Sequence, residues 1–380
     1  MILYLLIVTL VYFVYQNRGE KRVVSVLLFF VILFLCGGYM CGSDWRQYEL
    51  IFNSNVSIRE ISFEPGIYAL MLIFRKIWDN YWFFSIVIKV ACFWSIWKLI
   101  QKYAKEHALL ALVFFISFYG IYLFVDAPLR NLLAIGVFMC SCLLLDRNKL
   151  LSYGVCLSAL FFHASAIICL PLLLIIDKKV PSWLFLVAYL FSLVLSFFPD
   201  FLRTVLVDSY VGNLLFIGDK VTHYFEYGFA AESLISSSFS LGEVLKIILF
   251  FFVFFNGKRI KSFDYGTIIF NGCMIFFIVA KLGAAINVLM RLGCFFSPFY
   301  AIAIGVIIKC FAARDKLFYS FGVFLLSLLL TYKTVSADYR FVPYTNYITY
   351  NIVHFGKNLS FYERSQYNFI HSPYADSPDK

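Results

Sequence analysis

The sequence predicts an all-α, polytopic integral membrane protein. Hydrophobic residues make up 62% of the 380 residues and charged residues only 14%, whereas a soluble domain contains about 25% charged residues. Long apolar runs alternate with short charged segments, and no soluble stretch is large enough to fold alone. We therefore expect residues 1–380 to form a single transmembrane domain.

The apolar runs give the candidate membrane-spanning helices in order. No basic residue precedes the first run, so it lacks the charged start of a signal peptide and is expected to remain as the first span. The runs are Ile2–Tyr15, Val23–Cys41, Tyr81–Trp97, Ala108–Val125, Leu129–Leu145, Leu150–Ile176, Pro181–Phe198, Leu241–Phe255, Tyr265–Ala285, Leu292–Ile308 and Leu317–Tyr332.

A shorter apolar run, Gly66–Phe74, follows Glu64 and Pro65. At about 1.5 Å per residue it is too short to cross a hydrocarbon core of about 30 Å. It predicts a re-entrant or interfacial helix over residues 66–77, with Pro65 suited to the first helical turn. The alternative is an extension through Trp78 that makes a short span.

The positive charges set the expected orientation, because cytoplasmic loops of membrane proteins are enriched in Lys and Arg. With the N-terminus outside, six short segments fall inside and hold 16 of the 32 Lys and Arg but only six of the 22 acidic residues. The formal net charge of +10 is thus a topology signal and indicates no nucleic-acid partner. The segments are Gln16–Arg22, Lys98–His107, Asp146–Lys149, Asp177–Val180, Asn256–Asp264 and Lys309–Lys316.

This orientation requires a break within Leu150–Ile176, since both flanks of that run are then cytoplasmic. His163 lies in its middle, and the other ionisable side chains of the run are Tyr153 and cysteines. An ionisable group inside a membrane is costly and usually functional. We expect a pair of short helices broken near His163, and about twelve crossings with both termini outside. The alternative is one long tilted span that buries the histidine.

The outer face is expected to comprise the loops 42–65 and 199–240 and the C-terminal tail 333–380. Acidic residues, arginines and tyrosines gather in these segments. Aromatic rings stack on sugars, and the arginine fork matches phosphate oxygens, so this face suits a ligand that carries sugar and phosphate. The alternative is that the polar residues are solvated and the tyrosines belong to the interfacial belt.

The sequence shows no pattern for metal or nucleotide chemistry. Its ten cysteines have no metal-ligand spacing, and we interpret them as small packing residues. It contains no HExxH or GxSxG motif and no Gly-rich phosphate loop after a strand. We expect no metal and no cofactor.

Several local patterns follow one another in a characteristic order. They are Gly42-x-Asp44-x-x-x-Tyr48, Glu64-x-Gly66, Arg130-x-x-x-Ala134, Phe162-His163-x-Ser165, a late arginine at Arg291 and Pro343-Tyr344. This ordered set resembles the EpsG-like branch of the Wzy-type polymerases, which polymerise the repeat units of O-antigen, capsule or exopolysaccharide. The chain departs from that pattern at Asn131, where the family commonly has Gln, and at Cys41 and Gly42, where an Arg is usual.

The resemblance implies a metal-independent glycosyltransferase in the bacterial inner (cytoplasmic) membrane. It would move a growing glycan from one undecaprenyl diphosphate carrier onto a sugar of another, on the periplasmic side. The implied partners are the lipid-linked glycan donor and acceptor and membrane lipids. A protein that regulates chain length is a further expected partner.

Such a reaction needs cations for the departing lipid diphosphate. Arginines stabilise developing charge through charge-assisted hydrogen bonds, without a metal. We assign this role to Arg130 and Arg291, with Lys281 as a third cation. The alternative for Arg130 is an interfacial anchor that reaches to the lipid headgroups.

The reaction also needs a base for the acceptor hydroxyl. A carboxylate or a neutral histidine serves if it lies within hydrogen-bond reach. We assign the base to Glu64 or Asp44, with His163 positioning it or sharing the proton. The alternatives are a solvated loop acid or helix cap for either carboxylate, and a buried structural histidine. The expected substrate contacts are Tyr48, Asn287 and Tyr344.

Other activities fit parts of the same pattern. An O-antigen ligase would use the same donor with another acceptor. A lipid-linked oligosaccharide flippase would need charge along a central cavity on both faces, whereas the charge here favours the outer ends. A membrane acyltransferase would also use a buried histidine, but no acyl-donor motif accompanies His163.

Overall fold

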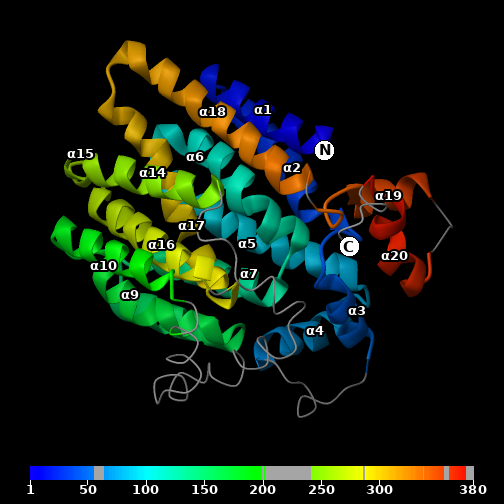
Figure 1. Cartoon of the computed structure of the whole chain (residues 1–380). Helices are drawn as coiled ribbons and strands as arrows, with labels where there is room; N and C mark the ends of the chain where they lie inside the picture. The colour runs from blue at the N-terminus through cyan, green and yellow to red at the C-terminus, as the bar shows by residue number, and fades with distance from the viewer. Residues whose placement is uncertain are drawn as a thin grey trace. The chain divides into compact units, whose positions relative to one another are not determined.

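The computed structural model describes residues 1–54, 64–198, 201, 241–285, 287–336, 338–354 and 359–373, except the side chains of 118, 241 and 284–290. The described chain is helical almost throughout (Figure 1). It divides into two compact units, which we describe separately. Unit 1 comprises Met1–Ile167 and Ile304–Lys380, and unit 2 comprises Ile168–Ala303.

Unit 1 begins with two apolar helices and continues through the longer helices of its core. Its α-helices in the first part of the chain are α1 (Ile2–Gln16), α2 (Lys21–Cys36), α3 (Trp45–Asn53), α4 (Pro65–Ile77), α5 (Tyr81–Ala104), α6 (Ala108–Phe115), α7 (Leu129–Leu144) and α8 (Lys149–Ser158). Between α5 and α6 lies the 3-10 turn η2 (Lys105–His107), and α6 continues into the π-helical turns η3 (Ile116–Gly120) and η4 (Tyr122–Asp126).

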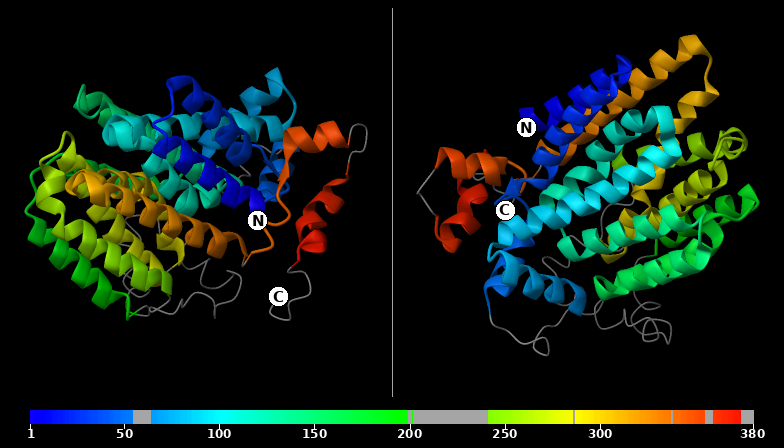
Figure 2. Two further views of the ribbon diagram at one scale, coloured as in Figure 1. Left: turned by 90° about the horizontal axis from the view of Figure 1, so that it is seen from above. Right: turned by 180° about the vertical axis from the view of Figure 1, so that it is seen from behind.

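Local sequence signals set several of these helix starts. The side chain of Asn80 accepts a hydrogen bond from the Phe83 backbone N–H and caps α5, and Asn148 caps α8 in the same way. Pro128 precedes α7. In the core, α7 packs against α5 and α8, while α1 packs against α6 and against α18 (Ala313–Ser336) (Figures 1 and 2).

The short helix and the helix break that the sequence predicted are present, whereas the re-entrant or interfacial position of the short helix stays a prediction. The short helix after Glu64 is α4, whose 13 residues span only about 20 Å. The run around His163 is broken: α8 ends in the 3-10 turn η5 (Ala159–Phe161), and the chain resumes after His163 in the 3-10 turn η6 (Ala164–Ile168). The following helix, α9 (Cys169–Ile176), belongs to unit 2, so the return of this pair to one membrane face stays a prediction.

The C-terminal tail of unit 1 folds back onto the end of α2. Strand β1 (Gly38–Tyr39) pairs antiparallel with β2 (Thr345–Asn346), and the helices α19 (Tyr347–Val353) and α20 (Phe361–His371) follow. This two-residue ladder is a small departure from the all-α expectation, and the sequence patterns did not predict the tail helices.

Unit 2 is also helical. Its α16 (Gly266–Ala285) packs against α9 and against the three described helices that lie between the two in the sequence, and its Phe276 ring stacks on the Tyr300 ring of the helix that follows. The neighbouring helices are α10 (Ser182–Leu195), α14 (Leu241–Phe255), α15 (Gly257–Lys261) and α17 (Asn287–Ile307), the last of which continues into unit 1.

The helices are those of an integral membrane protein. Within the described residues, four helical segments are long and apolar enough to cross a bilayer, and shorter apolar helices accompany them. Three of the four long segments follow single apolar runs of the sequence to within about four residues. The fourth, Tyr81–Phe115, joins the run Tyr81–Trp97 to part of the run Ala108–Val125 through helical residues of the expected loop Lys98–His107. The number of twelve crossings, the single transmembrane domain and the orientation stay predictions. The four segments are Tyr81–Phe115, Gly266–Gly283, Arg291–Cys310 and Ala313–Ser336.

Candidate active site

Arg130 joins three segments of unit 1 that are distant in sequence. It lies in the first turn of α7, directly after Pro128 and Leu129. Its Nε donates to the hydroxyl of Tyr48 over 3.0 Å, and its Nη1 donates to Oε2 of Glu64 over 2.9 Å. The side chains of Arg130 and Glu64 are 22% and 10% exposed. This is an ion pair with limited access to water, in which each partner compensates the charge of the other.

Glu64 also reaches the turn that contains His163. It stands at the N-cap of α4, but its side chain does not cap that helix. Instead, Oε1 accepts from the backbone N–H of Ala164 over 2.9 Å. Gly66 permits this approach, because a Cβ there would lie 2.4 Å from the carbonyl oxygen of Phe161. The Glu64-x-Gly66 pattern thus fixes the start of α4 against the break in the run around His163.

The hydrogen bonds of His163 define the state of its ring. Nδ1 accepts from the backbone N–H of Ser165 over 3.2 Å and lies 2.6 Å from the Ser165 hydroxyl. A backbone N–H can only donate, so Nδ1 carries a lone pair and a neutral ring carries its proton on Nε2. In this arrangement His163 offers a hydrogen-bond donor at Nε2.

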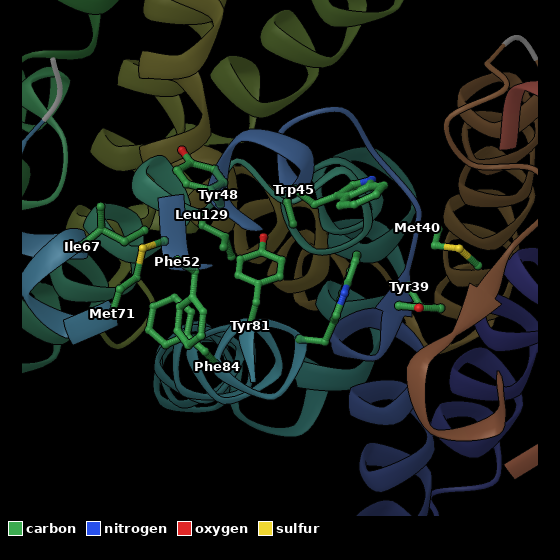
Figure 3. Packing of buried hydrophobic residues seen from close by; sticks show 12 residues of the cluster. Tyr39, Met40, Trp45, Tyr48, Phe52, Ile67, Met71, Tyr81, Phe84 and Leu129 are labelled. Carbon is green, nitrogen blue, oxygen red and sulfur yellow. The ribbon is translucent and has the colours of Figure 1, made fainter. Parts of the chain in front are cut away.

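Asp44 and Tyr48 lie one turn apart at the start of α3, as their spacing predicted. Tyr48 is 3% exposed, and burial raises the pKa of its hydroxyl, which therefore stays protonated. The hydroxyl points away from the aromatic side chains of Phe52 and Phe84 that pack beneath it (Figure 3). Asp44 is partly exposed, and its Oδ1 accepts from the Ser43 hydroxyl over 3.2 Å.

A second charged pair, Asp126 and Arg340, fixes the backbone around Gly42, the glycine of the first motif. The Ser43 backbone N–H donates to Oδ1 of Asp126 over 2.9 Å, and Arg340 lies 3.4 Å from Oδ2. Burial raises the pKa of Asp126, while the charge of Arg340 opposes this shift. Gly42 has a φ of +82°, and a Cβ there would lie 2.4 Å from the carbonyl oxygen of Asp126. Only glycine fits this left-handed, close contact.

Sequence reasoning missed a third pair, Glu49 and Arg364. Arg364 Nη1 donates to Oε1 of Glu49 over 2.6 Å, and the Trp82 indole donates to the same oxygen over 3.2 Å. Glu49 is 4% exposed. The pair fastens α20 to α3. Its partners are 315 residues apart, and no spacing signal in the sequence connects them.

Three further predicted residues, Lys281, Arg291 and Asn287, belong to unit 2. In unit 2, Lys281 is 2% exposed and lies 3.4 Å from Glu243, which is itself bonded to Lys246 over 2.6 Å. Arg291 is partly buried in α17. Asn287 is the first residue of α17, and its side chain lies outside the described residues.

Tyr344, a predicted substrate contact, lies in the packing of unit 1. Its hydroxyl donates to the Phe34 carbonyl oxygen, and its ring packs against the rings of Tyr4 and Phe34. In the part of the chain that the structure describes, no three His, Cys, Asp or Glu side chains are grouped to hold a metal ion.

Apolar membrane-length helices and a partly buried Arg–Glu pair beside a broken helix define a helical integral membrane protein with a polar site. The model of the EpsG family matches residues 21–346. The chain therefore belongs to the EpsG family, the family of Wzy-type, exopolysaccharide polymerase-like membrane proteins. No curated protein and no solved structure matches the chain.

Proposed function

We propose that this protein polymerises polysaccharide repeat units carried on undecaprenyl diphosphate, at the periplasmic side of the bacterial inner membrane. The observation that supports this most is the contact of Arg130 with both Glu64 and Tyr48, next to the turn of His163. These residues come from separate motifs of the resemblance and meet in one unit. A glycosyl transfer from a diphosphate needs a cation for the leaving group and a carboxylate or histidine as base, and both kinds of group are present here.

In the proposed step, the oxygen of an acceptor sugar hydroxyl bonds to the anomeric carbon of the donor glycan. The bond between that carbon and the diphosphate oxygen breaks, and undecaprenyl diphosphate leaves with the electron pair. The hydroxyl proton passes to a carboxylate of the protein. The growing glycan thereby moves from one carrier onto the sugar of the other.

Arg130 binds the departing diphosphate in this proposal. Its guanidinium is planar and permanently charged, and it can bond to two phosphate oxygens at once. Glu64 and Tyr48 fix its plane through Nη1 and Nε. Arg291 is the second candidate cation. Lys281 is the weaker third, because Glu243 already offsets its charge.

We assign the base to Asp44 and a positioning role to Glu64. Glu64 has one oxygen bonded to Arg130 and the other to the Ala164 N–H. Donors on both oxygens stabilise the carboxylate and make it a weaker proton acceptor. Asp44 is partly exposed and bonded to the Ser43 hydroxyl. It shares a helical face with Tyr48, whose hydroxyl contacts Arg130. His163 donates from Nε2 and orients a substrate oxygen.

The test is polymerisation by the purified protein in lipid nanodiscs, with its lipid-linked repeat unit as sole substrate. We expect a ladder of glycans and release of undecaprenyl diphosphate. A ligase would form product only when another acceptor is added, and a flippase would form no glycosidic bond. Either outcome would refute the proposal. In the same assay, Arg130→Lys should form little polymer. Arg75→Lys is its matched control and should form polymer as wild type does, because Arg75 lies on α4 beside the exposed Asp79.

A further inference from the structure

Unit 1 contains a cavity of about 890 Å³ that shares no residue with the candidate active site. The end of α1, the end of α5, the turn η2 and the start of α18 form its walls. These ends carry three of the basic segments that the charge pattern assigns to the cytoplasm. The cavity therefore lies on the face that is expected to be opposite the polymerisation site. Two residues of its wall, Tyr15 and Arg18, come before residue 21, where the match to the family model begins.

The cavity is lined by both basic and apolar side chains. Arg18, Lys105 and Lys316 supply positive charge. Within the described residues, neither Arg18 nor Lys316 pairs with a carboxylate. The acid in the lining, Glu106, lies 3.5 Å from Lys309, which offsets its charge. It also lies 3.3 Å from His107, but burial lowers the pKa of that imidazole to about 4, so His107 is neutral at neutral pH. Apolar side chains form the other part, namely Val14, Val24, Trp97, Leu109, Ile308 and Leu317.

Two of these cations have unusual backbone conformations. Arg18 has a φ of +46° and Lys105 a φ of +53°, although neither is a glycine. Such conformations cost about 1–3 kcal/mol each and cluster at ligand sites, where the surrounding structure enforces them. Arg18 follows the C-cap residue of α1, Lys105 is the C-cap residue of α5, and both line the same cavity.

Polar contacts in the wall preform the cavity. The Tyr15 hydroxyl lies 3.0 Å from Nδ1 of His107 and thereby links α1 to η2. The Gln16 amide donates to the Ser320 hydroxyl over 2.8 Å and links α1 to α18. The walls are therefore held together without a ligand.

We propose that this cavity binds the headgroup and upper acyl chain of an anionic lipid. A phosphate ester beside hydrocarbon matches cations beside apolar side chains, and basic pockets at the cytoplasmic ends of helices bind such headgroups. Two lipids carry this chemistry: an anionic phospholipid of the bilayer and a polyprenyl phosphate. A soluble anion would use the cations but leave the apolar wall without a partner.

The test is native mass spectrometry of the full chain after reconstitution with defined lipids. One arm supplies phosphatidylglycerol in phosphatidylcholine, and a second supplies polyprenyl phosphate in phosphatidylcholine. We expect wild-type protein to retain one lipid in at least one arm, which identifies the source. The double variant Arg18→Ala/Lys316→Ala should retain it at least about tenfold less, because each surface cation contributes about 1 kcal/mol to binding an anionic lipid.

The matched control is Arg314→Ala/Lys258→Ala. It removes two exposed cations that do not line the cavity themselves, from segments expected on the same side of the membrane. It should retain the lipid as wild type does. Gln101→Trp should lower retention without changing charge, because the larger ring occupies the cavity. Equal loss in both double variants, no retained lipid in either arm, or unchanged retention in Gln101→Trp would overturn the proposal.

Discussion

Arg130 donates from Nη1 to Oε2 of Glu64 over 2.9 Å, although 66 residues separate the two in the sequence. The contact brings the start of α7 to the start of α4. The second oxygen of Glu64 binds the Ala164 N–H, so the same carboxylate fixes both the arginine and the turn of His163. An arginine held in this way has its orientation set before substrate arrives, which favours a charged transition state.

Replacing Arg130 by lysine should abolish most polymerisation. Lysine keeps the charge but is a point donor that cannot bond to Tyr48 and Glu64 in a planar fork. We expect at least a tenfold loss of polymer for Arg130→Lys, and a similar loss for Arg291→Lys. The measurement is surface glycan length at matched protein level, with Arg75→Lys near wild type. Long polymer from both variants would exclude these arginines from the diphosphate site.

Removing one partner of the Glu64–Arg130 pair should cost more stability than removing both. Glu64→Leu leaves a charged guanidinium with reduced access to water and should destabilise the protein by about 3–5 kcal/mol. Glu64→Leu/Arg130→Met removes both charges and should recover much of that loss, while remaining inactive. Thermal unfolding in detergent measures the first effect and polymer formation the second. Additive destabilisation in the double variant would show that the two residues are not coupled.

Gly66→Ala should disrupt the site through a single methyl group. The new Cβ would lie 2.4 Å from the Phe161 carbonyl oxygen, so α4 must shift and weaken the contact of Glu64 with Ala164. We expect lower thermal stability and strongly reduced polymer. Gly154→Ala is the control, because a Cβ there meets nothing within 4 Å, and alanine in a helix gains up to about 1 kcal/mol over glycine. Equal effects of the two variants would refute this close contact.

Two substitutions of His163 distinguish the role of its Nδ1 from the role of its Nε2. The amide oxygen of His163→Asn can accept from Ser165 in place of Nδ1 but cannot reach the position of Nε2. We expect this variant to keep its thermal stability and lose most polymer. His163→Gln, whose amide nitrogen can donate near the position of Nε2, should keep more polymer than His163→Asn. The control is His354→Asn, because His354 is an exposed residue at the C-terminal end of α19. Wild-type ladders from both His163 variants would leave the histidine with a packing role only.

Cysteine labelling tests the orientation. In a background without the native cysteines, a membrane-impermeant reagent should modify a cysteine at position 219 and spare one at Lys258. The charge count places the first outside and the second in the cytoplasm. The reverse pattern would contradict the two-crossing interpretation of Leu150–Ile176, because that break sets the orientation of every later helix.

The helix bounds were largely predictable, because apolar runs between charged segments are a direct consequence of the bilayer. The break at His163 followed from charge parity, and α4 from Pro65 and the length of its run. The tail helices and the β1–β2 ladder were not predictable from apolar runs. Their contacts depend on pairs such as Glu49 and Arg364, which are distant in sequence.

The sequence motifs predicted residues that the structure brings together in unit 1, whereas the roles of these residues in a reaction stay predictions. The motifs named Arg130, Glu64, Tyr48 and His163, and the structure brings all four segments together. Which carboxylate is already bonded on both oxygens depends on tertiary contacts that no spacing encodes. For the same reason, the sequence did not show that Glu243 pairs with Lys281 or that the Phe34 carbonyl accepts from Tyr344, and the ligand roles of Lys281 and Tyr344 stay predictions.

The most direct test of the account is an experimental structure of the protein with undecaprenyl diphosphate bound. The account predicts phosphate oxygens within hydrogen-bond distance, about 2.7–3.2 Å, of the Arg130 guanidinium, with Glu64 still bonded to the Ala164 N–H. A diphosphate bound with no contact to Arg130, and with the Tyr48–Arg130–Glu64 contacts unchanged, would contradict it.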